Sequence, residues 1–378
     1  MKPISACRSC GNAGLQTVLE LGATPLANAL LTQEQLAAPE EKYPLTLVFC
    51  PDCSLTQIVE TVAPEKLFGE YLYLSSFSET MIRHAGELAQ EMMARLGLGT
   101  QSLVIEAASN DGYLLQHYAR AGVPVLGIEP ARNIAELAQA RGLPTLAEFF
   151  SESLGRQLRE RGQRADVFHA HNVLAHVADL NGFVAGIRQV LKDDGLAVIE
   201  APYVRDMIEH CEFDTIYHEH LCYFSLTALV RLFDRHGLLI RDVLRVPIHG
   251  GTLRIYATPK RYDRRPAPSV TALLAEERHL GLGRFEYYRT FGDRVRALRA
   301  SLKATLTSLK ASGKRVAAYG ASAKGSTLLN FCGVGREVLE FVADRSTVKQ
   351  GRYTPGTRLP ICPPEKVLEE MPDYLLLL

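Results

Sequence analysis

The sequence has no long apolar run and no surplus of either charge. No segment approaches the about 18 consecutive apolar residues of a membrane-spanning helix, and no basic stretch followed by an apolar core follows Met1. We therefore expect a cytoplasmic protein with neither a membrane span nor a signal peptide. Lys and Arg number 42, as do Asp and Glu, so no overall field attracts nucleic acid or a membrane. Any phosphate that the protein binds must be held by local groups.

The composition and the hydrophobic pattern favour a soluble α/β protein of two or three domains. The chain has 378 residues, which exceeds one ordinary core, and 47% of them are hydrophobic. Apolar strands alternate with amphipathic helices from residue 103 to about residue 200, which predicts βαβ crossovers and a doubly wound parallel sheet. The predicted strands are 103–107, 123–130, 165–171 and 195–202.

Helical repeats and a second strand–turn–helix unit organise the other segments. Residues 79–97 predict a helix whose apolar face includes Leu88, Met92 and Leu96. A longer helical repeat begins at Phe291, and residues 315–331 predict a strand, a glycine turn and a helix. This second unit follows the form of the first but does not establish a sequence repeat.

Four of the eight cysteines form two C-x-x-C pairs. Cys7 and Cys10 make the first pair and Cys50 and Cys53 the second. Two such pairs can surround a tetrahedral zinc, and four protein ligands leave no open position, so we predict a structural zinc in a small N-terminal lobe. Four unrelated buried or reactive cysteines are the alternative. A redox role is disfavoured, because neither pair begins a helix after a strand.

A polar turn follows the first of the predicted strands. It runs from Glu106 through Ala108 and Asn110 to Gly112, and Glu129 ends the next strand, where a carboxylate can bind ribose hydroxyls. The turn has one of the three glycines of the dinucleotide pattern, so an NAD site fits poorly. Asn110 and the amides near Gly112 suit the carboxylate and ammonium of S-adenosylmethionine better. An ordinary βαβ turn with an exposed Glu129 is the alternative.

The densest set of titratable side chains is Tyr217-His218-Glu219-His220. Four adjacent groups that can exchange or steer protons favour general-base chemistry. On an extended segment, Tyr217 and Glu219 share one face and the histidines the other, whereas a turn brings them closer. A hydrogen-bonded surface turn and a metal site are the alternatives.

Asn172 and His176 lie just after the strand at 165–171, at the end where ligands of open α/β sheets bind. For His176, a satisfied histidine of the core or of a helix start is an equally good interpretation.

The chain also carries a characteristic order of motifs: two C-x-x-C pairs, EAASNDGYLL, GIEPA, NVLAHV, EAPY, FDTIYHEHLCYFS, HGGTLR and GASAKGSTLLNFCG. In this order they resemble the motifs of zinc-containing, S-adenosylmethionine-dependent sugar C-methyltransferases, which act on nucleotide-linked 4-keto-deoxysugars. The match runs from Cys7 to Tyr374, and IYHEH, HGG and GASAKG are specific only in combination.

The resemblance implies an α/β fold with a zinc lobe, a doubly wound class I methyltransferase domain and a C-terminal Rossmann-like domain. The expected boundaries are 1–70 for the lobe, 71–258 for the methyltransferase domain, 259–312 for a linker and long helix, and 313–378 for the Rossmann-like domain. Relatives usually continue through another helix and strand, so we expect the last domain to be truncated.

The resemblance also implies roles for individual residues. The expected catalytic residues are His220 as general base, with Glu219, Tyr217, Tyr71 and His176. The expected cofactor-binding residues are Glu106, Ala108, Asn110, Gly112, Glu129 and Asn172. The expected substrate-binding residues are Lys324 as a phosphate contact, Ser322, His249 and Gly250. No role is assigned to His218.

The hypothesis is that His220 removes a proton next to a sugar ketone while Glu219 orients its imidazole. Tyr217, Tyr71 or His176 donates to the enolate oxygen. An O- or N-methyltransferase of small molecules, a non-enzymatic zinc-and-nucleotide module and an NAD-dependent sugar oxidoreductase remain alternatives. The nucleotide base, the sugar, the methylated carbon, the stereochemistry and the oligomeric state stay open.

Overall fold

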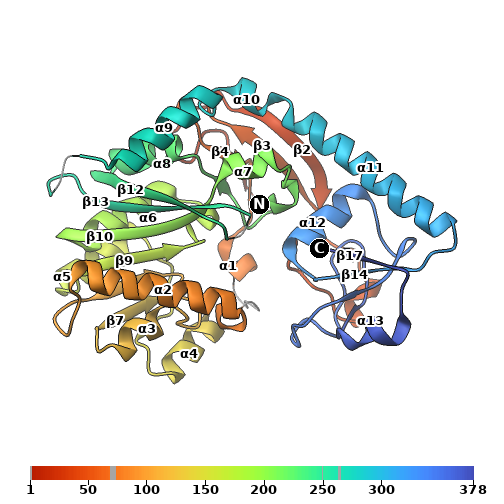
Figure 1. The fold of residues 1–378 in the computed structure, drawn as a ribbon, viewed down its shortest axis with the longest axis horizontal. Helices are drawn as coiled ribbons and strands as arrows, with labels where there is room; N and C mark the ends of the chain where they lie inside the picture. The colour runs from red at the N-terminus through yellow and green to blue at the C-terminus, as the bar shows by residue number, and fades with distance from the viewer. Residues whose placement is uncertain (1, 69–73, 249, 263–264) are drawn as a thin grey trace.

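The computed structural model describes residues 2–68, 74–248, 250–262 and 265–378 (Figure 1). Tyr71 and His249 lie outside the described residues. Figure 1 shows the central sheet and its helices on one side, the C-terminal sheet on the other, and the helices α9, α10 and α11 arching above both. The N-terminal strands β2 to β4 lie under that arch.

Seven strands of the described chain form the central sheet, in the order β12-β13-β10-β9-β6-β7-β8. The pairs from β10 to β8 are parallel, whereas β13 runs antiparallel between β10 and β12. The chain leaves β6 for β7 on one side and returns to β9 on the other, which creates a switch point at their carboxyl ends. The strands are β6 Val104–Ala107, β7 Val125–Ile128, β8 Thr145–Leu146, β9 Ala165–His171, β10 Leu191–Pro202, β12 Leu238–Val246 and β13 Thr252–Pro259.

Successive residues of these strands enter different hydrophobic clusters, as the two-residue period of a strand requires. Val104 and Val167 pack with residues of α2 and α3, whereas their neighbours Ile105 and Phe168 pack with residues of α5 and α6. Both faces of the sheet are therefore buried, which explains the nearly continuous apolar strands. The helices of this part are α2 Glu79–Leu96, α3 Leu115–Arg120, α4 Arg132–Ala140, α5 Glu152–Glu160, α6 Leu180–Val190, α7 Val204–Glu209 and α8 Leu226–Arg235.

The helix predicted over 79–97 is confirmed as α2. The Ser78 hydroxyl caps its start by accepting from Met81 N at 3.3 Å, and Gly97 ends it with a left-handed φ of 61°. Leu88 and Met92 are buried as predicted, but Leu96 is 39% exposed because the last turn extends past the sheet's core. The predicted stripe was wrong at that end.

The N-terminal lobe contains an antiparallel sheet in the order β11-β4-β3-β2. Its strands are β2 Gln16–Thr24, β3 Tyr43–Phe49, β4 Thr56–Ile58 and β11 Cys222–Tyr223. The fourth strand, β11, comes from the middle of the chain, directly after the Tyr-His-Glu-His segment. Short segments around the sheet are β1 Lys2–Pro3, β5 Glu60–Thr61, and the helices η1 Glu34–Ala37 and α1 Pro64–Phe68.

The C-terminal part is a small parallel sheet in the order β16-β15-β14-β17. Its strand β14 (Val316–Tyr319) and helix α12 (Ala323–Cys332) confirm the predicted strand, glycine turn and helix. The predicted long helix is α11, Phe291–Ala311. The other elements are α9 Pro268–Leu280, α10 Phe285–Arg289, β15 Leu339–Ala343, β16 Ile361–Cys362, α13 Glu365–Glu370 and β17 Tyr374–Leu377.

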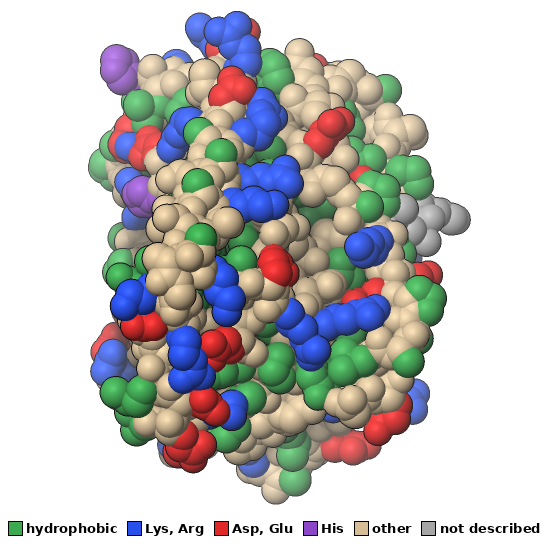
Figure 2. Space-filling model, turned by 90° about the vertical axis from the view of Figure 1, so that its right-hand side faces the viewer, with side chains coloured by type: hydrophobic (Ala, Val, Ile, Leu, Met, Phe, Trp, Pro, Cys, Tyr) green, Lys and Arg blue, Asp and Glu red, His purple; other side chains and the backbone are tan. Residues whose placement is uncertain are grey.

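The surface of the C-terminal part carries both signs of charge. Figure 2 shows Lys and Arg side chains interspersed with Asp and Glu across this face, in keeping with the balanced composition. Among the described residues, no helix is both long and apolar enough to cross a bilayer.

Candidate active site and metal centre

The four cysteines of the C-x-x-C pairs converge in the N-terminal lobe. Their sulfur atoms all lie within 4.8 Å of one another. The Sγ atoms are 3.5 Å apart in both Cys7–Cys53 and Cys10–Cys50. Four sulfurs at about 2.3 Å from one tetrahedral zinc would lie roughly 3.8 Å apart, so the cluster fits the metal with little adjustment.

Backbone turns aim each pair at the cluster. The carbonyl of Cys7 accepts from Gly11 N and that of Cys50 from Ser54 N, both at 2.9 Å. Gly11 and Ser54 both have left-handed φ angles, 79° and 63°, which such a turn requires. Gln57 Nε2 also donates to Cys7 Sγ at 3.1 Å, which favours the thiolate form.

The polar turn after β6 folds around a carboxylate. Ala108, Asn110 and Gly112 all have left-handed φ angles, 54°, 50° and 80°. The Glu129 side chain accepts from Asn110 N at 3.0 Å and from Ala131 N at 2.9 Å. Glu129 is only 5% exposed, so the interpretation of an exposed strand end is wrong. It lies at the end of β7, beside the switch point.

Buried polar atoms at this turn lack partners within the described chain. Both carboxylate oxygens of Glu106 and Oδ1 of Asn172 are buried without a hydrogen bond to any described residue. Burial and the nearby carboxylate of Glu129 raise the pKa of Glu106 well above its ordinary value. Orphaned acceptors are costly unless a ligand fills them. The set fits the ammonium and hydroxyl donors of S-adenosylmethionine.

The Tyr-His-Glu-His segment is a turn that pairs Tyr217 with His220. His220 N donates to Tyr217 O at 2.9 Å, and the two rings lie 4.1 Å apart. The His220 Nδ1 lies 2.9 Å from Thr215 O, which can only accept, so Nδ1 carries the proton. Nε2 is then the acceptor in its 2.8 Å contact with the Tyr217 hydroxyl. This arrangement leaves a basic Nε2 on a neutral imidazole.

The other two residues of the turn face the N-terminal lobe. His218 Nε2 donates to Pro44 O of β3 at 2.9 Å. Glu219 Oε1 accepts from Asn28 Nδ2 at 2.7 Å, so the lobe holds this carboxyl. The expectation that Glu219 orients the His220 imidazole is wrong, because the partner of His220 Nδ1 is Thr215 O. Burial raises the pKa of Glu219 to about 7.

His176 connects this turn to the central sheet. It ends the short helix η3 (Leu174–His176) after β9, and its ring lies 4.8 Å from that of His220. Burial lowers the pKa of His176 to about 4, so the ring is neutral near pH 7. Asn172, with a φ of 55°, begins the same connection and donates its N–H to Glu200 O at 2.9 Å.

The two groups of predicted residues therefore meet at one edge of the sheet. Strands β6 and β9 are adjacent and parallel, so the turn after β6 and the Asn172–His176 connection after β9 leave the same edge. His220 reaches that edge through its contact with His176. The turn after β6 and the connection that carries Asn172 and His176 therefore lie at one edge, with His220 beside His176.

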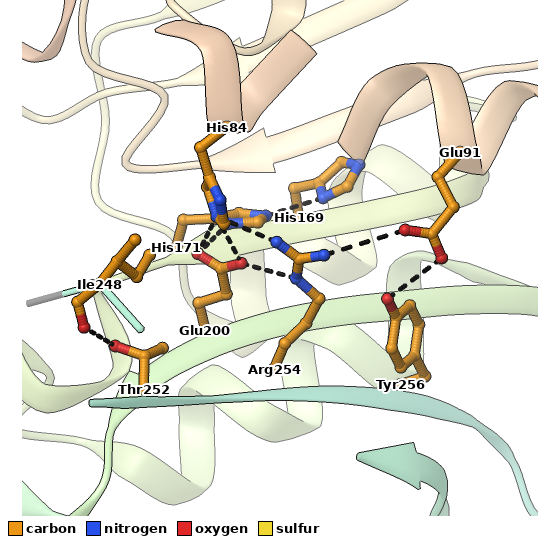
Figure 3. Close-up of polar contacts among 9 residues, drawn as sticks. All are labelled: His84, Glu91, His169, His171, Glu200, Ile248, Thr252, Arg254 and Tyr256. Atoms are coloured by element: carbon orange, nitrogen blue, oxygen red, sulfur yellow. Dashed lines mark hydrogen bonds and ion pairs between the residues drawn. The ribbon is translucent and has the colours of Figure 1, made fainter. Parts of the chain in front are cut away.

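A buried polar network beneath this edge was not predicted (Figure 3). Glu200 of β10 contacts His84 Nε2 at 2.9 Å, His171 Nδ1 at 3.0 Å and Arg254 Nε at 2.6 Å. Although burial opposes ionisation, these partners hold the pKa of Glu200 well below its ordinary value. His169 extends the network to His171 at 2.9 Å. The available signal was Glu200 in EAPY, but its partners lie on three other elements.

The predicted substrate residues occupy two places. Gly250 has a φ of 82°, and a Cβ there would overlap the Glu212 carboxylate, so the turn requires glycine. Ser322 caps α12 by accepting from Gly325 N at 2.9 Å. Helix α12, which carries Lys324, packs against Phe213–Thr215, and the charge of Lys324 opposes the rise that burial causes in the pKa of Glu212.

Strand order and site together define a class I S-adenosylmethionine-dependent methyltransferase fold with a zinc lobe and a Rossmann-like domain. Family models match residues 7–68 as "Putative zinc binding domain", residues 81–243 as "Methyltransferase domain" and residues 247–378 as "C-methyltransferase C-terminal domain". C-methyltransferase NovU of Streptomyces niveus is 38% identical over 378 residues, which cover 100% of this chain and 90% of that protein.

More distant relatives cover less of the chain. A ubiquinone biosynthesis O-methyltransferase of Bartonella quintana is 26% identical over 97 residues, 25% of this chain and 39% of that protein. Magnesium protoporphyrin IX methyltransferase from Synechocystis, solved with bound S-adenosylmethionine, has a TM-score of 0.36 at 13% identity, covering 51% of this chain and 88% of that chain.

The chain belongs to the S-adenosylmethionine-dependent C-methyltransferase family. It is therefore an enzyme with S-adenosylmethionine as cofactor and a structural zinc in its lobe. Family membership disfavours the non-enzymatic module and the NAD-dependent oxidoreductase.

Proposed function

We propose that this enzyme methylates the carbon next to the ketone of a nucleotide-linked 4-keto-deoxysugar, with His220 as general base. The observation that carries this proposal is the 2.9 Å contact of His220 Nδ1 with Thr215 O, which assigns the tautomer of the neutral ring. Its Nδ1 proton is directed at Thr215 O, which leaves Nε2 as a proton acceptor beside the cofactor edge of the sheet.

The proposed proton transfer uses the neighbours of His220. When the sugar C–H approaches Nε2, that nitrogen takes the proton, and the carbon's electron pair moves toward the ketone oxygen. The Tyr217 hydroxyl then turns from Nε2 to donate to that oxygen, and neutral His176 offers a second donor. Tyr71 is proposed as a further donor. When bound, S-adenosylmethionine supplies an electrophilic sulfonium methyl for the new carbon–carbon bond.

The proposed binding sites follow from the same geometry. The turn residues Glu106, Ala108, Asn110 and Gly112, with Glu129 and Asn172, would hold the cofactor. The nucleotide would lie between the C-terminal turn at Ser322 and Lys324 and the loop of His249 and Gly250. The proposal also divides the chain into a zinc lobe (1–70), a methyltransferase domain (71–258), a linker with a long helix (259–312) and a Rossmann-like domain (313–378).

Solvent deuterium exchange at the sugar carbon, followed by NMR without cofactor, tests the proposal. We expect exchange with the wild-type enzyme and at least ~100-fold slower exchange and methylation with His220→Ala. Calorimetry should show unchanged S-adenosylmethionine binding. Activity of His220→Ala within a few-fold of wild type would remove His220 from this role. Methylation of oxygen or nitrogen without exchange would favour the alternative acceptor.

A further inference from the structure

Asn28 of the N-terminal lobe reaches the catalytic turn. Its Nδ2 donates to Glu219 Oε1 at 2.7 Å, across 191 residues of sequence. Asn28 itself is exposed, whereas Glu219 is 4% exposed. No sequence motif singled out this asparagine.

The loop that carries Asn28 is fixed from two sides. Leu26 and Ala27 are buried just before it, and Leu30 N closes a tight turn on Asn28 O at 2.9 Å. Leu31 then forms a two-way backbone bridge with Tyr353 of the C-terminal part, both bonds being 2.9 Å. The amide is therefore presented by a restrained backbone, although its side chain is exposed.

Glu219 needs such a partner because burial separates its carboxyl from water. Burial favours the neutral acid, and the Asn28 amide opposes this by donating to the carboxylate. A hydrogen bond to a charged acceptor stabilises a protein more than one to a neutral acceptor. The Asn28 amide therefore also fixes the orientation of the Glu219 side chain.

We infer that Asn28 is a positioning residue that holds the Glu219 carboxylate in place within the turn that carries His220. The inference rests on the proposed function, because it assumes that this turn contains the base. The loop that carries Asn28 belongs to the zinc lobe and also contacts the C-terminal part at Tyr353. Its effect on catalysis would come from the Asn28 contact with Glu219. Asn28 is neither one of the zinc ligands nor one of the residues proposed to bind the cofactor.

The test compares Asn28→Ala, Glu219→Ala and the double variant in the full-length, zinc-loaded enzyme. We expect Asn28→Ala to lower kcat about 10-fold or more and to shift the acid limb of the kcat profile to higher pH. Zinc content and S-adenosylmethionine affinity should stay at wild-type values. In the Glu219→Ala background, Asn28→Ala should cause no further loss of deuterium exchange, because each change removes the same hydrogen bond.

A matched control is Asn181→Ala, which also removes hydrogen bonds to the lobe. Asn181 Nδ2 donates to Arg8 O at 2.9 Å and Ser9 O at 3.2 Å, away from the catalytic turn. We expect this variant to keep wild-type kcat and the wild-type pH profile. Equal losses in both asparagine variants would show that docking of the lobe, not Glu219, is responsible, and would overturn the inference.

Two failures can be told apart. If His220→Ala retains exchange, the proposed base is wrong. If His220→Ala is inactive but Asn28→Ala keeps the wild-type kcat and pH profile, only the role of Asn28 is lost. An Asn28→Ala effect of equal size with and without Glu219→Ala would also refute it.

Discussion

Removing the zinc should strongly slow catalysis while leaving cofactor binding nearly intact. A structural zinc bound by thiolates contributes roughly 10–16 kcal/mol of apparent binding free energy. Whole domains are stable by only about 5–15 kcal/mol, so the lobe should unfold without the metal. The residues expected to bind the cofactor lie elsewhere, on the central sheet between Glu106 and Asn172.

The size of the catalytic loss can be worked from the contacts between the lobe and the catalytic turn. Three hydrogen bonds would disappear: Asn28 to Glu219 at 2.7 Å, His218 to Pro44 O at 2.9 Å, and Ile58 N to Leu221 O at 3.0 Å. At about 0.5–1.5 kcal/mol each, they restrain the turn by about 1.5–4.5 kcal/mol. That free energy corresponds to a roughly 10- to 2000-fold loss of turnover.

The assay combines chelation with Cys50→Ser. Metal analysis should find about one zinc per wild-type chain and little in the variant. Calorimetry should give an S-adenosylmethionine Kd within about 3-fold of wild type, since the sheet remains folded, whereas methyl transfer should fall as above. Metal-free enzyme with wild-type turnover would refute the reasoning, and so would simultaneous loss of cofactor binding.

Three further predictions concern stability. Gly112→Ala should lower the free energy of unfolding by about 2–4 kcal/mol in urea denaturation, because its φ is 80° and the new Cβ would overlap Leu143. Glu200→Gln should cost about 3–5 kcal/mol in the same assay, because the buried Arg254 guanidinium loses its buried charge partner and keeps only the more exposed Glu91, at 3.9 Å. Folding raises the pKa of Glu219 from its ordinary value to about 7, so the folded protein binds more protons between those pH values and this carboxyl destabilises it increasingly as pH rises. Glu219→Gln should therefore raise the free energy of unfolding by about 3 kcal/mol at pH 8 and by little at pH 4, and an equal effect at both pH values would contradict this.

The sequence predicted those features that depend only on residues close together in the chain. The strand at Ala165–His171 appears with the predicted bounds, and the helices α2 and α11 begin where their repeats begin. Strand β12 was missed because charged residues such as Arg241 and Asp242 interrupt its apolar pattern. Its pairing with β13 supplies the order that the local pattern lacks.

The candidate site divides in the same way. Spacing alone indicated the zinc ligands, because each C-x-x-C turn is local and only the meeting of two turns needs the fold. The tautomer of His220 depends on Thr215 O, five residues away, and on the turn at residues 217–220. The sequence was compatible with an extended segment there as well as with a turn. The sequence placed Glu219 beside His220, but its side chain points into the lobe toward Asn28.

By itself, the sequence determined the repeating pattern of strands and helices, the metal-ligand set and the chemical character of the catalytic segment. These depend on side-chain type and on the period of the backbone, which act over a few residues. The tertiary structure alone decided that β11 completes the lobe's sheet, that Glu200 meets Arg254 and two histidines, and that Asn28 holds Glu219. Such contacts join residues far apart in the chain, and their partners are set by how whole layers pack.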